Sequence, residues 1–132
     1  MAHSPAVLGG YLELNRALKR AKLDRRVSER ISLAVQERQG CDLCLNAHAD
    51  AARSLGVSED EIALAKKGTS ADPKIAAMVA FGYLVYTEPA SITDEQMNEL
   101  RSFGYSEREI ADVVGVVAIN VMTGAFNLVA GL

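Results

Sequence analysis

The two cysteines of the chain lie close to its only histidine away from the N-terminus. They are Cys41 and Cys44, followed by His48, in the segment Cys-Asp-Leu-Cys-Leu-Asn-Ala-His. A helix repeats about every 3.6 residues, so positions i, i+3 and i+7 share one face, and we expect these side chains to be neighbours. Two thiols one turn apart can close a disulfide, and a nearby imidazole can take or give a proton. The spacing therefore indicates dithiol redox chemistry.

The cysteine pair is expected at the start of a helix. Gly40 is a typical helix-ending residue, so a new helix can begin directly after it, at Cys41. The unpaired N–H groups and the dipole at a helix start favour an anion, which lowers the pKa of a thiol there. Leu45 and Ala52 continue the same face, so it points inward. The alternative interpretation is two small buried cysteines beside a histidine of the core.

An acid that orients the histidine is predicted on the preceding helix. If residues 25–38 and 41–55 form an antiparallel hairpin, Glu29 lies within a turn of His48 and Gln36 lies beside Cys44. A carboxylate, a histidine and a thiol in this order form the usual relay that activates a nucleophile. The alternative for Glu29 is a first-turn acid that only stabilises the helix dipole. Glu37 is expected on the solvated end of its helix.

Metal and haem sites fit the same residues less well. A structural zinc site needs four ligands, and this helix supplies at most Cys41, Cys44 and His48. His3 lies at the N-terminus, and the chain has no second cysteine pair. Covalent c-type haem needs histidine directly after the second cysteine, where this chain has Leu45. We predict no metal and no cofactor other than the redox-active cysteine pair, with a zinc-binding module as a minor alternative.

The elements that must position these residues are predicted to be helices. Hydrophobic residues make up 49% and aromatic residues 5% of the chain, which favours closely packed helices over sheets. Ser58, Thr93 and Ser106 each begin a capping box with the residue three positions later, and no segment predicts a strand. We expect an all-α, single-domain bundle of about six to seven helices over residues 1–132, with helices near 5–22, 25–38, 41–55, 58–68, 73–86, 93–104 and 106–132.

Charge and hydropathy exclude several classes of function. The net charge of −3 and the pI near 5.4 argue against a generally basic surface for nucleic acid. No basic segment followed by an apolar run opens the chain, so we predict no signal peptide and a cytoplasmic location. Residues 113–132 carry no charge and are long enough to span a bilayer, but glycine and asparagine interrupt them. We predict a buried or subunit-interface helix there, and no membrane partner.

Three features together carry a resemblance to a known family: Glu29, the run Gly40-Cys41-x-x-Cys44-x-x-x-His48, and the segment Gly56-Val57-Ser58. They resemble the carboxymuconolactone decarboxylase superfamily, and within it the redox branch of alkylhydroperoxidase D-like proteins. That branch places glutamate twelve residues before the first cysteine and histidine four after the second, as here. The decarboxylase branch generally lacks the cysteine pair, which argues against lactone decarboxylation.

The resemblance implies an all-helical fold, assembly as homotrimers or homohexamers, and thiol-dependent reduction of peroxides or partner disulfides. It also implies that Glu29, Cys41, Cys44 and His48 form the catalytic set, and that a thiol donor such as a lipoyl or thioredoxin-like protein supplies electrons. The best-known member has a second histidine between the cysteines, where this chain has Leu43.

We therefore expect an alkylhydroperoxidase-like peroxidase or disulfide reductase of the antioxidant kind. Which sulfur attacks first stays open, since the helix start favours Cys41 and the adjacent His48 favours Cys44. The alternative is a redox-sensing or ligand-binding module on the same fold.

Overall fold

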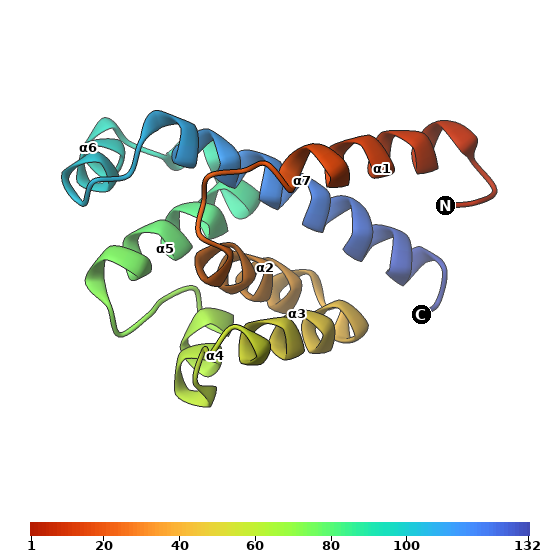
Figure 1. Cartoon of the computed structure of the whole chain (residues 1–132), viewed down its shortest axis with the longest axis horizontal. Coiled ribbons are helices and arrows are strands. Elements are labelled where there is room, and N and C mark those ends of the chain that lie inside the picture. Colours follow the sequence, from red (N-terminus) through yellow and green to blue (C-terminus); the bar gives the residue numbers. More distant parts are fainter.

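The computed structural model describes all residues, 1–132, and is helical throughout (Figure 1). It contains no strand, which confirms the all-α prediction. One short 3-10 turn, which the sequence did not predict, begins at Pro89, just after the preceding helix has ended at Thr87. The elements are α1 (Pro5–Leu18), α2 (Arg25–Gln39), α3 (Asp42–Ser54), α4 (Glu59–Lys66), α5 (Pro73–Thr87), η1 (Pro89–Ser91), α6 (Asp94–Ser102) and α7 (Glu107–Val129).

Helix α2 is the centre of the fold, because it packs against α3, α4, α5 and α7. Its opposite faces belong to two separate apolar clusters. Ile31 and Val35 join α5 and α7 in the larger cluster, whereas Leu33 faces α3 and α4 in the smaller one. Ile31 and Leu33 therefore lie on different sides of this helix. Apolar side chains on both faces thus hold α2 in the middle of the molecule, and α3, which completes the candidate site, packs along one side of it (Figure 1).

The helix starts follow the predicted caps, with one correction. Thr93 and Ser106 form reciprocal capping boxes at α6 and α7. The Ser58 hydroxyl accepts the N–H of Glu61 at 3.2 Å, but the Glu61 carboxylate does not return to Ser58. It accepts instead from the Ser70 hydroxyl at 2.6 Å and the Ala71 N–H at 2.9 Å. The predicted box at Ser58 is therefore wrong, because the loop before α5 uses its carboxylate.

The Glu61 carboxylate also pairs with the buried guanidinium of Arg30, at 3.3 Å. Burial would raise the pKa of Glu61, but the hydrogen bonds from Ser70 and Ala71 and the charge of Arg30 hold that pKa below its ordinary value of 4.5. The folded state thus favours the ionised carboxylate. The resulting stabilisation is fully present above pH 4.5 and is lost as the pH falls through the lowered pKa.

We expect Glu61→Gln to lower the free energy of unfolding by about 2 kcal/mol at pH 7, the range for hydrogen bonds to a charged group. The difference from wild type should shrink as the pH falls below 4.5 and then through the lowered pKa, because wild-type Glu61 becomes protonated there too. Urea unfolding at several pH values measures it. Glu99→Gln is the matched control, since Glu99 is exposed on α6. A difference that grows in acid would contradict this account.

Helix α7 is the longest element and contains a long apolar stretch. It is the one helix long and apolar enough to cross a membrane by length and composition alone. Of the most apolar 18-residue stretch of this helix, 28% is buried inside the molecule. The buried face includes Val113, Val117 and Asn120, which pack toward α2. Helix α1 lies along α7 and has no buried residue (Figure 1), so a large part of both helices remains uncovered in one chain.

Candidate active site

The two cysteines occupy the first turn of α3. Gly40 ends α2 in the left-handed conformation, with φ of 85°, so the chain reverses within one residue. Cys41 is the N-cap of α3, and its sulfur accepts the N–H of Cys44 at 3.3 Å. The sulfur of Cys41 therefore lies where the unpaired N–H groups of the helix start favour negative charge.

Cys41 and Cys44 are joined by a disulfide, with their Cα atoms 5.3 Å apart. Both are buried, with 1% of Cys41 and 6% of Cys44 exposed. The spacing of one helical turn thus brings the sulfurs within bonding distance, as the sequence predicts. The pair fits a redox role, since two sulfurs at this separation can alternate between a dithiol and a disulfide.

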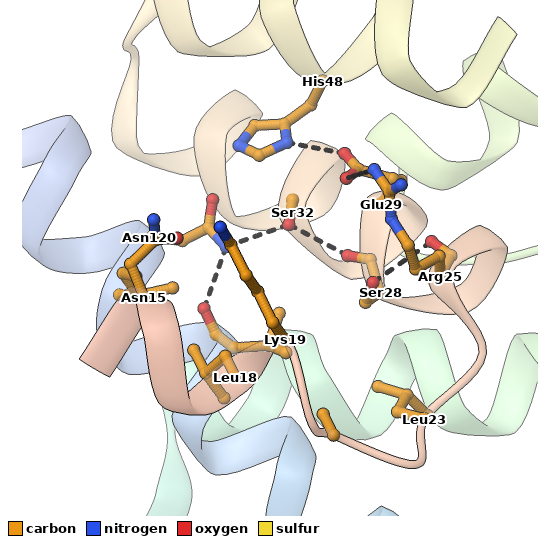
Figure 2. Close-up of a pocket in the computed structure, with 13 residues that line it drawn as sticks. Asn15, Leu18, Lys19, Leu23, Arg25, Ser28, Glu29, Ser32, His48 and Asn120 are labelled. Atoms are coloured by element: carbon orange, nitrogen blue, oxygen red, sulfur yellow. Dashed lines mark hydrogen bonds and ion pairs between the residues drawn. The ribbon is translucent and has the colours of Figure 1, made fainter. Parts of the chain in front are cut away.

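Glu29 and His48 meet across the α2–α3 hairpin. The carboxylate oxygen Oε2 of Glu29 lies 2.7 Å from Nδ1 of His48, as the antiparallel arrangement predicts. Their side chains are 13% and 27% exposed, so water competes only partly with this contact. Arg25 lies 3.7 Å from the other carboxylate oxygen but is largely exposed. The second ring nitrogen of His48 points away from Glu29 (Figure 2) and is free to exchange a proton.

A buried polar network crosses from α2 to α7 beside this pair. The Gln36 amide donates to the backbone oxygen and to Oδ1 of Asn120, at 2.9 and 3.0 Å. Asn120 in turn donates to the hydroxyl of Ser32 at 2.9 Å. The amide of Gln36, expected beside Cys44, therefore bonds to α7 and not to a sulfur. The network fixes the helix that forms the far wall of the site.

The close approach of α7 to α2 depends on Gly124. A Cβ added at this position would collide with the side-chain oxygens of Gln36 and Gln39. A bulkier residue would push the end of α7 away from α2, and with it the α7 residues that line the cavity beside Cys44. Asn120 and Asn127 on α7 are the site residues that sequence reasoning missed. Their only signal was a polar amide within an otherwise uncharged, apolar segment.

Two cavities meet at His48. One, of about 360 Å³, is lined by Cys44, His48, Asn127 and residues of α1. The other, of about 520 Å³, lies on the Glu29 side of the imidazole and reaches Lys19 (Figure 2). Cys41 lines neither, so Cys44 is the cysteine that lines one of these cavities.

The same site offers little to a metal ion. No group of three or more histidine, cysteine, aspartate or glutamate side chains lies close enough together to hold one. What the site does bring together is a disulfide, an imidazole beside it and a carboxylate that orients the imidazole. These groups can move electrons at sulfur and protons at nitrogen.

Comparison with known proteins gives fold relatives of low sequence identity. An uncharacterized peroxidase-related protein from Silicibacter sp. is 22% identical with a TM-score of 0.83, over 95% of this chain and 68% of that one. The alkylhydroperoxidase AhpD core of a peroxidase-related protein from Ralstonia eutropha is 20% identical with a TM-score of 0.84, over 97% and 70%. A protein of unknown function from Agrobacterium tumefaciens, a candidate antioxidant defence protein AhpD, is 20% identical with a TM-score of 0.82, over 96% and 89%.

At these identities the likeness shows a shared fold. No curated protein matches the chain. The model of the carboxymuconolactone decarboxylase family, however, matches residues 5–80, which include α2, α3 and the whole Glu29–Cys41–Cys44–His48 group. The chain therefore belongs to the carboxymuconolactone decarboxylase family and has an AhpD-like helical fold.

Proposed function

We propose that this protein is a thiol-dependent oxidoreductase that reduces peroxides or the disulfides of a partner. The observation that carries the proposal is a cysteine disulfide whose Cys44 lines a cavity together with a carboxylate-bound histidine. We further propose that Glu29, His48, Cys41 and Cys44 are its catalytic residues. The family relationship supports a redox role, since AhpD-like relatives include proteins described as peroxidase-related.

In the reduced protein, Cys44 is the first nucleophile because Cys44, and not Cys41, lines the cavity with His48. Glu29 accepts the Nδ1–H of His48, which leaves the other imidazole nitrogen able to take the thiol proton of Cys44. The thiolate attacks one peroxide oxygen, the O–O bond breaks, and the departing alkoxide takes a proton from the imidazolium. The products are an alcohol and a Cys44 sulfenic acid.

Cys41 then resolves the sulfenic acid. Its thiol attacks the Cys44 sulfur, the S–O bond breaks, and water leaves as the Cys41–Cys44 disulfide forms. A dithiol donor, of the lipoyl or thioredoxin-like kind, attacks Cys44, and Cys41 departs as a thiolate at the start of α3. The second donor thiol breaks the mixed disulfide, so the donor is oxidised and both cysteines are reduced. The chain needs no further cofactor in this cycle.

The test is turnover of purified, reduced protein with an organic hydroperoxide and a small dithiol. We expect many equivalents of peroxide to be consumed per chain, with a mass loss of two hydrogens in the oxidised Cys41–Cys44 peptide. Consumption of a single equivalent, with no recycling by a panel of dithiol donors, would instead assign the protein as a redox sensor. Permanently free thiols would contradict both functions.

We also propose that the working protein is a cytoplasmic homotrimer or homohexamer. Leu128 and Val129 on α7 and Leu12 on α1 are exposed, and α1 has no buried residue. A large apolar surface left open in one chain usually marks an interface. Light scattering at micromolar concentration should give a particle of three or six chains of 14.1 kDa each. A stable particle of one chain, or partition into lipid vesicles, would contradict this prediction.

A further inference from the structure

Cys44 has a hydrogen-bond donor that comes from the other end of the chain. The side-chain amide of Asn127 on α7 lies with Nδ2 3.3 Å from the sulfur of Cys44. Asn127 is half-buried and lines the same cavity as Cys44 and His48. The sulfur of Cys44 therefore meets an N–H donor on the side that a substrate would approach.

The backbone holds this amide in place from both directions. On the N-terminal side, Gly124 lets α7 come close to α2. On the C-terminal side, the N–H of Leu132 donates to the backbone oxygen of Asn127 at 2.9 Å, and Gly131 has a positive φ of 76°. This is the turn that ends a helix with a left-handed glycine, so Asn127 lies in a defined last turn and not in a frayed end.

We propose that Asn127 is a catalytic residue that stabilises the Cys44 thiolate by donating its amide N–H to the sulfur. This inference rests on the proposed dithiol chemistry. A disulfide sulfur is a weak acceptor, whereas a thiolate carries a full charge and accepts strongly. The bond therefore becomes stronger when the disulfide is reduced and the Cys44 thiol loses its proton. Asn127 favours the reactive anion, while His48 moves the proton.

The first experiment isolates Cys44. In the Cys41→Ser background Cys44 is the only thiol, and the pH dependence of its alkylation by iodoacetamide reports its ionisation. Adding Asn127→Leu should raise the alkylation midpoint by about one pH unit, so that alkylation well below the midpoint becomes about tenfold slower. Asn46→Leu is the matched control, since Asn46 is an exposed asparagine on α3. It should leave the midpoint unchanged.

The second experiment uses the chain with both cysteines. Equilibration with a thiol–disulfide buffer should show a more negative reduction potential in Asn127→Leu, by about 30 mV if the thiolate is destabilised tenfold. Circular dichroism checks that Asn127→Leu is folded. If it is not, Asn127→Ala replaces it in both experiments. A merely structural asparagine would move neither the midpoint nor the potential.

Unchanged midpoints and potentials in both Asn127 variants would overturn the inference, and so would an equal shift in Asn46→Leu. A shifted midpoint in a protein whose wild type never turns over peroxide would support the role of Asn127 and reject the peroxidase proposal. Failure of the Asn127 inference and failure of the peroxidase proposal therefore give different results.

Discussion

Cys44→Ser is expected to abolish peroxide reduction, with a loss of at least about 10³-fold in turnover. A serine hydroxyl does not ionise near neutral pH, so no anion faces the cavity that Cys44 lines with His48. Cys41→Ser should behave differently, because Cys41 lies outside the cavity and acts only after the first step. It should consume one equivalent of peroxide per chain and then stop, with Cys44 left as a sulfenic acid.

Single-turnover stoichiometry separates the two roles. Reduced protein, freed of external thiol, is mixed with a known excess of hydroperoxide, and a sulfenic-acid trap is detected by peptide mass. The trap should label Cys44 in the Cys41→Ser variant and nothing in Cys44→Ser. One equivalent consumed by Cys44→Ser, with the trap on Cys41, would reverse the order of attack. The sulfur of Cys41 would then have to become accessible in the reduced protein.

The part of the site that the sequence predicts is the part made within one hairpin. Glu29 and His48 are nineteen residues apart, and the reversal between them is fixed by a single glycine whose conformation ends α2. Helical periodicity and one turn suffice to place such a pair. The same local logic gives the cysteines their position at the start of α3, because a helix that follows Gly40 directly must begin at them.

The contribution of α7 could not be predicted in this way. Asn120 and Asn127 are more than eighty residues from their partners Gln36 and Cys44, and only the packing of α7 on α2 brings them together. Its sequence shows an apolar helix, but not which of its polar residues face inward. The predicted capping box at Ser58 is wrong for a related reason. The Glu61 carboxylate is expected to bond back to Ser58, but it bonds to Ser70 in the following loop and pairs with Arg30. Tertiary contacts override local propensity at such positions.

Glu29→Gln is expected to lower turnover by roughly 10²–10⁴-fold, the range for a positioned element of acid–base catalysis. The carboxylate holds Nδ1 of His48 at 2.7 Å and supplies a negative charge to the imidazolium that forms when the thiol proton is taken. A glutamine of nearly the same shape keeps the packing but not the charge. The imidazolium, and with it the thiolate, is therefore less stable, and thiol alkylation should shift to higher pH.

Glu37→Gln is the matched control on the same helix. Glu37 is exposed, eight residues beyond Glu29, and lies beside Arg53 and Lys66 in a groove away from the disulfide. The same loss of one negative charge from α2 should therefore leave turnover and the alkylation profile unchanged. Equal alkylation profiles for wild type and Glu29→Gln, with a shifted profile for Glu37→Gln, would show that the wrong carboxylate had been chosen. A shift of similar size in both variants would show that the thiols respond to the net charge of α2 and not to the Glu29–His48 contact. We do not expect this result, because salt screens exposed surface charges.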